Sequence, residues 1–312
     1  MSSTSLDFKG RVAIVTGAGG GLGRQHALAL AARGAKVVVN DLGGARDGAA
    51  GTGSVTAAQA VVEEIRAAGG EAIANGASVT DFAAVQTMVA EAMDKWGRVD
   101  ILVNNAGILR DKSFAKMELD DFALVVDVHL MGAVNCTKAV WAIMNDQKYG
   151  RIVMTTSSSG LYGNFGQANY GAAKMALVGL MQTLSIEGAK NDIRVNCLAP
   201  TAATRMTEGL MSEEVLAALK PEAVVPAMLV MVAENAPTRT ILCAGAGTFE
   251  AAHITMTQGV HIGLSGDAPE LLAAKLAEVT NRQNDTVPMS GSAQGTNEVQ
   301  KMMASVGKLT AH

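Results

Sequence analysis

The sequence contains few aromatic residues, few cysteines and no excess of charge of either sign. Aromatic residues make up 4% of the chain, and the formal net charge is −4 over 312 residues. Acidic and basic residues are interspersed, whereas a nucleic-acid-binding protein usually gathers a basic excess on one face. We therefore expect no nucleic-acid partner.

The few cysteines argue against a disulfide framework. Cys136, Cys197 and Cys243 are far apart, odd in number and set in apolar runs. Cysteines in such positions are typical of reduced core residues. We expect neither a disulfide nor a metal site.

Long charge-free hydrophobic runs are also missing. The first residues, Met1 to Lys9, are polar and lack the apolar core of a signal peptide, and no later run reaches membrane-spanning length without a charge. The last residues, Leu309 to His312, do not form the small-basic-leucine ending of a peroxisomal targeting signal. We therefore expect a cytoplasmic protein with no membrane span.

Short β-branched runs alternate with longer alanine-rich runs along most of the chain. The short runs have the composition of buried strands, and the long runs have helical length and spacing. Such alternation predicts right-handed βαβ crossovers and hence an α/β fold, a doubly wound parallel sheet of the Rossmann type. The expected strands are Val12–Thr16, Lys36–Asn40, Ile101–Asn104, Arg151–Met154, Ile193–Cys197 and Ile241–Cys243, and the expected helices include Leu22–Ala32, Ala57–Ala68, Phe82–Lys95 and Ala172–Glu187.

Two segments depart from this alternation. Residues 43–53 are rich in glycine, which predicts a surface loop. The strand pattern ends near residue 250, and helical candidates follow at Pro269–Val279 and Asn297–Val306. We therefore expect one dinucleotide-binding and catalytic domain, residues 1–249, and a mostly helical C-terminal extension, residues 250–312, that covers the substrate mouth or contacts another subunit.

A glycine-rich turn follows the first expected strand and opens the first expected helix. Gly17 permits the tight turn, Gly21 lets backbone amides approach a pyrophosphate, and Gly23 lets helix and strand pack closely. The helix that begins at Leu22 then points its N-terminus at the anion. This arrangement indicates a dinucleotide site.

Asp41 follows the second expected strand, about twenty residues after the turn. Its carboxylate could accept hydrogen bonds from both ribose hydroxyls of an adenosine and would repel a 2′-phosphate, which favours NAD over NADP. The same side chain could instead cap the following loop. The other residues that we expect to contact NAD are Leu22, Ser78, Val79, Asn105, Ala106 and Gly107.

Ser157, Tyr170 and Lys174 form the candidate catalytic group. If a helix begins near Gln167, Tyr170 and Lys174 are four positions apart and share one helix face. A free phenol has a pKa of about 10, and a neighbouring ammonium lowers it, so Tyr170 would become a usable general acid or base. Ser157 follows another expected strand and is placed to hydrogen-bond the oxygen on which charge develops during hydride transfer.

These motifs together resemble the short-chain dehydrogenase/reductase family. The matching residues are Thr16-Gly-x-x-x-Gly21-x-Gly23, Asn104-Asn-Ala-Gly107, and Ser157 thirteen residues before Tyr170-x-x-x-Lys174. The resemblance covers the chain from about Asp7 to Gly247. It implies that Tyr170 and Lys174 also contact the cofactor, with Lys174 on the nicotinamide ribose, and that the protein is a homodimer or homotetramer.

A narrower resemblance is to the (3R)-hydroxyacyl-CoA dehydrogenase unit of the peroxisomal multifunctional β-oxidation enzyme. It rests on Val39-Asn-Asp-Leu-Gly-Gly44, Asn105-Ala-Gly-Ile-Leu-Arg-Asp111, Tyr162-Gly-Asn-Phe-Gly-Gln-Ala-Asn-Tyr170 and Arg205-Met-Thr207. The resemblance implies a 3-hydroxyacyl or 3-ketoacyl thioester as substrate, although this subgroup is also similar to steroid 17β-dehydrogenases.

Two positions depart from the broad family pattern. Many members have Asn in the fourth helix where this chain has His129. His129 could shuttle protons itself, or its backbone carbonyl could hold a water relay to Lys174. A third possibility is a histidine that only packs within the helix. The Pro-Gly that usually follows the sixth strand is Pro200-Thr201 here, and the narrower subgroup also lacks that glycine.

The sequence thus predicts an NAD-dependent oxidoreductase that converts (3R)-3-hydroxyacyl-CoA to 3-ketoacyl-CoA, with Ser157, Tyr170, Lys174 and His129 as candidate catalytic residues. One alternative is a hydroxysteroid or general secondary-alcohol dehydrogenase with the same machinery and a different pocket. Another is a dinucleotide-binding protein without catalysis, against which the intact Ser157, Tyr170 and Lys174 argue.

Overall fold

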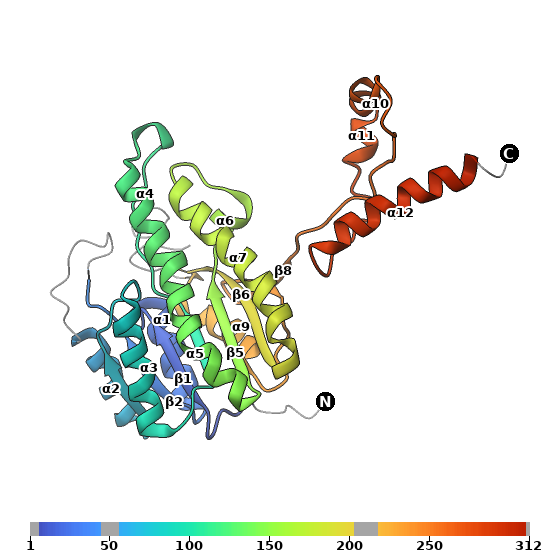
Figure 1. The fold of residues 1–312 in the computed structure, drawn as a ribbon. Coiled ribbons are helices and arrows are strands. Elements are labelled where there is room, and N and C mark those ends of the chain that lie inside the picture. The colour runs from blue at the N-terminus through green and yellow to red at the C-terminus, as the bar shows by residue number, and fades with distance from the viewer. Residues whose placement is uncertain (1–5, 45–55, 203–217, 310–312) are drawn as a thin grey trace. The chain divides into compact units, whose positions relative to one another are not determined.

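A parallel β-sheet forms the centre of the larger part of the protein (Figure 1). The computed structural model describes residues 6–44, 56–202 and 218–309. The strand order is β3-β2-β1-β4-β5-β6-β7-β8, and every pairing from β3 to β7 is parallel. The strands are β1 Val12–Thr16, β2 Lys36–Asn40, β3 Glu71–Asn75, β4 Ile101–Asn104, β5 Gly150–Thr155, β6 Ile193–Thr201, β7 Ile241–Gly245 and β8 Thr248–Ala252.

Helices pack on the sheet in two groups (Figure 1). In one group, α1 (Gly21–Ala32) contacts α2 (Thr56–Ala67) and α9 (Val225–Val232). In the other, α3 (Phe82–Trp96) contacts α5 (Gly132–Gln147). The doubly wound α/β prediction is confirmed. The other elements of this part are η1 Phe114–Lys116, α4 Leu119–Val126, η2 Asp127–Met131, α6 Ser158–Tyr162, α7 Ala168–Gly188, η3 Ala189–Asn191 and η4 Pro221–Val224.

The sequence prediction missed two strands, β3 and β8. In β3, Ala72 is buried while Glu71 is exposed and the last three residues are half-buried, so this strand lacks the apolar run that marks the central strands. β8 lies where the strand pattern was expected to end. The loop predicted at 43–53 and the subgroup residues Arg205–Thr207 fall largely or wholly outside the described residues.

The parallel register collects the strand ends that carry the predicted site. Thr16 pairs with Asn40, Val15 with Val103, and Asn104 with Met154. Because parallel strands run in one direction, their carboxyl ends share one edge of the sheet. The glycine-rich turn, Asp41, Asn105 and Ser157 therefore all leave the sheet at that edge.

The amino edge of the sheet carries a network of buried charge. Asp100, whose side chain is fully buried, accepts hydrogen bonds from the backbone N–H of Val12 (2.9 Å) and from the guanidinium groups of Arg11 (3.2 Å) and Arg98 (2.6 Å). The ring of Tyr149 lies beside two guanidinium groups, those of Arg11 at 3.7 Å and Arg151 at 4.1 Å from its centroid. Removing one partner would leave the buried carboxylate of Asp100 uncompensated, so we expect substitutions of Arg11 or Arg98 to destabilise the fold.

One helical stretch is long and apolar enough to cross a membrane by length and composition alone. It runs from Leu119 to Gln147 through α4, η2 and α5. Within it, α4 packs against α7 and α5 packs against α3. These contacts are those of a core helix in a folded domain, which passes the same test of length and composition.

The chain divides into two compact units, Met1–Ala251 and Ala252–His312. The second unit contains α10 Ala268–Ala274, α11 Leu276–Val279 and α12 Ser292–Leu309, together with an antiparallel bridge between Met256 and Thr286. No side chain described in this unit, residues 252–305, is buried.

His26 on α1 makes the fold sensitive to acid. The side chain is fully buried, and neither ring nitrogen has a hydrogen-bond partner among the described residues. Burial lowers the pKa of His26 to about 4. Because the unfolded chain protonates this group near pH 6.5, stability from neutral His26 is complete above that pH and is lost as pH falls toward 4.

We expect the free energy of unfolding to fall by about 1.4 kcal/mol between pH 7 and pH 5.5 through His26. Urea denaturation across this range measures the slope, and the His26→Leu variant, which cannot take up the proton, is the matched control. An identical slope in His26→Leu and in the unchanged protein would contradict the prediction.

Candidate active site

The turn between β1 and α1 is built for close backbone contact. Gly17 and Gly21 have φ angles of +62° and +52°, which glycine adopts without strain. A Cβ on Gly17 would lie 2.8 Å from the Cα of Ala106, and one on Gly23 would lie 2.3 Å from the carbonyl oxygen of Gly17. Side chains at Gly17 and Gly23 would therefore open the turn.

The N-terminus of α1 can receive an anion. Its N-cap residue is Gly20, no side chain caps the helix, and its first turn contains no acidic residue. The first backbone N–H groups of a helix lack partners within the helix, and the helix dipole places partial positive charge there. The glycine turn thus fits the diphosphate of a dinucleotide. Leu22, also predicted to contact the cofactor, packs its side chain against the hydrophobic core.

Asn105 and Ala106 brace this turn from the end of β4. The side-chain amide of Asn105 donates to the carbonyl oxygens of Thr16 (2.9 Å) and Gly17 (3.0 Å). The hydroxyl of Thr16 accepts hydrogen bonds from the backbone N–H groups of Asn105 (3.0 Å) and Ala106 (3.1 Å). Sequence reasoning did not give Thr16 a role of its own, and its position as the last residue of β1 is the signal that could have found it.

Asp41 touches the same turn from the end of β2. Its carboxylate accepts hydrogen bonds from the backbone N–H groups of Gly19 and Gly43, both at 2.8 Å. The hydrogen bond from Gly43 is the loop-capping contact that we considered as the alternative role of Asp41. Each carboxylate oxygen still has capacity for a further donor, so ribose binding at Asp41 stays a prediction.

Ser78 and Val79 lie on a loop beside the start of α5. The hydroxyl of Ser78 hydrogen-bonds that of Thr80 at 2.8 Å, and the carbonyl of Val79 accepts from the side chain of Asn135 at 2.9 Å. A Cβ on Gly132 would lie 2.6 Å from a methyl carbon of Val79. Val79 and Gly132 line a small cavity at this edge of the sheet. Ser78 instead stabilises its own turn.

Ser157, Tyr170 and Lys174 meet where β5 ends. Ser157 is the N-cap of α6, and α7 begins two residues before Tyr170, close to the expected position. The Ser157 hydroxyl accepts a hydrogen bond from the backbone N–H of Ser159 at 3.2 Å, and it lies near enough to Tyr170 to lower the pKa of the phenol. Lys174 lies one turn further along α7, with its Nζ 5.4 Å from the Tyr170 ring centroid and donating to the carbonyl of Thr155 at 2.5 Å.

The direction of the Tyr170 pKa shift differs from the expectation. Burial raises the pKa of Tyr170, and the negative charge of Asp111 adds to this rise, while the hydrogen bond from Ser157 opposes it. Burial also lowers the pKa of Lys174 to about 7. Burial of the phenol thus sets the direction of the shift, and not the ammonium of Lys174, which we had expected to dominate.

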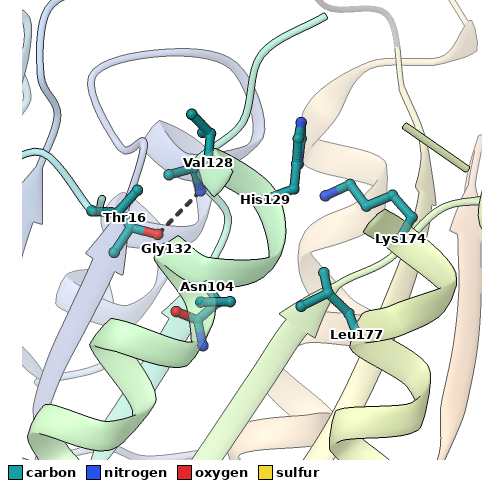
Figure 2. Close-up of a pocket in the computed structure, with 10 residues that line it drawn as sticks. Thr16, Asn104, Val128, His129, Gly132, Lys174 and Leu177 are labelled. Carbon is teal, nitrogen blue, oxygen red and sulfur yellow. Dashed lines mark hydrogen bonds between the residues drawn. The ribbon is translucent and has the colours of Figure 1, made fainter. Parts of the chain in front are cut away.

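His129 lies in the π-helical turn η2 and is 3% exposed. Figure 2 shows it beside Lys174 and across from Thr16 and Asn104, in the wall of a small cavity. The carboxamide oxygen of Asn104 and the Nδ1 atom of His129 have no hydrogen-bond partner among the described residues. The cavity thus holds unsatisfied polar atoms next to a buried lysine. Asn104 is a second residue whose part in this cavity sequence reasoning missed.

The described residues contain no group of three or more His, Cys, Asp or Glu side chains that could hold a metal ion.

A doubly wound sheet with a dinucleotide turn and a Ser-Tyr-Lys group at its carboxyl edge defines a dinucleotide-dependent oxidoreductase. The family model for short chain dehydrogenase matches residues 11–215. The chain therefore belongs to the short-chain dehydrogenase family, and it is an enzyme that acts on CH–OH groups. Members of this family generally use NAD or NADP.

Two relatives in sequence are informative. The chain is 47% identical over 289 residues to "Peroxisomal multifunctional enzyme A" of Dictyostelium discoideum, covering 92% of this chain and 64% of that protein. It is 48% identical over 207 residues to "3-oxoacyl-[acyl-carrier-protein] reductase" of Synechocystis, covering 66% of this chain and 80% of that protein. The chain thus spans less than two thirds of its multifunctional relative.

Two solved structures show the same fold. Full-length peroxisomal multifunctional enzyme type 2 from Drosophila melanogaster matches with a TM-score of 0.78 and 38% identity, over 96% of this chain and 51% of that one. A 7α-hydroxysteroid dehydrogenase complexed with NADH and 7-oxo glycochenodeoxycholic acid matches with a TM-score of 0.70 and 29% identity, over 79% of this chain and 97% of that one.

The predicted cytoplasmic location is wrong when judged by these relatives. Matching proteins from Dictyostelium, Drosophila, yeast and mouse are all named peroxisomal. The names point to the peroxisome, so the polar N-terminus and the lack of a small-basic-leucine ending were not sound grounds for a cytoplasmic assignment.

Proposed function

We propose that this enzyme oxidises (3R)-3-hydroxyacyl-CoA to 3-ketoacyl-CoA with NAD as the hydride acceptor. The observation that carries the proposal is that Ser157, Tyr170 and the buried Lys174 meet where β5 ends, with the Lys174 Nζ 5.4 Å from the Tyr170 ring centroid. The names of the relatives support an acyl substrate, since one is a 3-oxoacyl reductase. The structural relative complexed with NADH supports the choice of nicotinamide cofactor.

The proposed cofactor contacts begin at the glycine turn. The N-terminus of α1 would bind the diphosphate, Asp41 the adenosine ribose and Lys174 the nicotinamide ribose. Bound NAD would supply the carbon atom that takes up the hydride. Asn105 and Ala106 hold the turn through Thr16, so their contribution to binding is to keep the glycine backbone in place.

The proton and the substrate oxygen are handled by Ser157 and Tyr170. In oxidation, the Tyr170 phenolate takes the proton of the substrate hydroxyl as the C–H bond gives up its hydride, and Ser157 donates a hydrogen bond to the same oxygen. In reduction, the Tyr170 phenol returns the proton. Oxidation needs the phenolate form of Tyr170, so we expect kcat/KM for oxidation to rise as the pH increases through the pKa of Tyr170. Burial raises that pKa above the ordinary value for a tyrosine.

The test is a substrate panel followed by absorbance of the reduced cofactor. We expect turnover of (3R)-hydroxyacyl-CoA esters with NAD, and at least about tenfold lower kcat/KM for the (3S) esters. Equal turnover of both enantiomers would remove the thioester assignment. Hydroxysteroids belong in the same panel, because the 7α-hydroxysteroid dehydrogenase shares the fold at 29% identity. Faster turnover of a steroid alcohol would favour that second candidate.

The extension and the oligomeric state stay predictions. We propose that residues 250–312 cover the substrate mouth or contact another subunit, because the described side chains of residues 252–305 find no core within their own unit. We also keep the prediction of a homodimer or homotetramer, which sedimentation at several protein concentrations would test.

A further inference from the structure

The imidazole of His129 joins three parts of the active site. Its Nε2 atom lies 2.8 Å from the carbonyl oxygen of Ile108 and 3.1 Å from the backbone nitrogen of the same residue. Its ring meets the ring of Tyr170 edge-on, with centroids 5.1 Å apart and planes at 89°. Its Cε1 atom occupies the space above Gly107, where an added Cβ would lie only 2.2 Å away.

The backbone of η2 brings the ring into this position. Residues Asp127–Met131 form a π-helical turn between α4 and α5, and such turns inside α-helices occur often at functional sites. The turn places His129 over Gly107 and Ile108, which directly follow Asn105 and Ala106 in the loop that braces the glycine turn. His129 thus contacts a loop that serves the cofactor and a side chain that serves the substrate.

The surroundings keep the imidazole neutral and hold it through Nε2. Burial lowers the pKa of His129 well below its usual value, and the charge of Lys174 lowers it further. When Nε2 is unprotonated, it accepts a hydrogen bond from the backbone N–H of Ile108 at 3.1 Å. When Nε2 carries the proton, it donates to the carbonyl oxygen of Ile108 at 2.8 Å, so the backbone of Ile108 can hold either tautomer of the neutral ring.

We propose that His129 is a positioning residue that fixes the Gly107–Ile108 turn and the Tyr170 ring. This inference rests on the proposed function, in which Tyr170 carries the proton. It assigns His129 no proton transfer, because a ring that stays neutral throughout the working pH range has no proton to exchange.

The charged and titratable groups around Tyr170 determine what a change at His129 should do. Lys174 comes from α7, Asp111 from the loop after β4 and His129 from η2. Without the hydrogen bond between the imidazole and Ile108, the Tyr170 ring is no longer held in a fixed place among these groups. The pKa of Tyr170 should then change.

The His129→Phe variant tests this relation, since it keeps a ring at the Tyr170 contact and removes both nitrogens. We expect kcat for (3R)-3-hydroxybutanoyl-CoA to fall by at least about tenfold, with the Kd for NADH changed by less than about twofold. We also expect a shift in the ultraviolet titration of the Tyr170 phenolate, which is tractable because the chain has three tyrosines. The signal of Tyr170 is obtained by subtracting the Tyr170→Phe titration.

Several outcomes would overturn the proposal. Unchanged kcat with an unchanged titration would leave His129 as packing alone, and a parallel loss of NADH binding would show a general structural fault. A His129→Gln variant keeps an N–H near the Nε2 position and should recover part of kcat, so equal loss in both variants would also contradict the proposal. The titration and NADH binding need no thioester, so they test His129 even if the proposed substrate proves wrong.

A double substitution tests the contact with Gly107 independently. Gly107→Ala should lower kcat by about a hundredfold, because its methyl group collides with the imidazole. In a His129→Ala background the space is open, and the same Gly107→Ala change should cost less than about threefold. Equal losses in the two backgrounds would show that the ring and the turn are not coupled.

Discussion

Replacing Tyr170 by phenylalanine is expected to lower kcat/KM for alcohol oxidation by about a thousandfold and to leave the Kd for NADH within about twofold. In the proposed mechanism the hydroxyl of Tyr170 exchanges the substrate proton, and Ser157 cannot replace it, because Ser157 has no base of its own. Steady-state kinetics and fluorescence titration with NADH give the two values.

Tyr149→Phe is the matched control for Tyr170→Phe. It removes the same atom from a tyrosine at the amino edge of the sheet, where the ring lies beside Arg11 and Arg151. We expect its kcat/KM to match that of the unchanged enzyme. If Tyr170→Phe kept more than about a tenth of the activity, the proton would have to pass through another group.

Replacing Asp41 by asparagine is expected to raise the ratio of kcat/KM with NADP to that with NAD by about a hundredfold. The carboxylate charge that would repel a 2′-phosphate is removed, while the size of the side chain is kept. Asparagine also has one acceptor oxygen where aspartate has two, so one of the contacts to Gly19 and Gly43 is lost. The KM values for both cofactors should therefore rise.

Asp94→Asn controls for the change in net charge, because Asp94 is exposed on α3. The cofactor ratio should not change in this variant. A ratio that also stays unchanged in Asp41→Asn would show that Asp41 serves the loop alone. If the unchanged enzyme strongly preferred NADP, the proposal that Asp41 selects NAD would be contradicted without any variant.

The sequence was sufficient to predict the central strands and α7, the helix that carries Tyr170 and Lys174. β1, β2 and β4 have the predicted bounds because their β-branched runs are buried on both faces of the sheet. The spacing of four between Tyr170 and Lys174 was informative because it holds in any helix. β3 escaped prediction because an edge strand with one buried residue carries little periodicity.

The electrostatics of the site could not be predicted in the same way. The pKa of Tyr170 depends on how deeply the phenol and Lys174 are buried, and burial is set by segments far away in the sequence. The partner of His129 is Ile108, 21 positions earlier, and the contact exists because η2 is a π-helical turn. Local sequence patterns carry no direct signal for either feature.

Substitutions in the charge network at the amino edge of the sheet should have different effects from substitutions at the carboxyl edge. Asp100, Arg11 and Arg151 lie at the end of the sheet opposite the reacting groups, so changes there should alter how much folded enzyme a cell keeps rather than how fast each molecule works. A variant screen that scores yield and turnover separately would then sort substitutions by the end of the strand on which they fall.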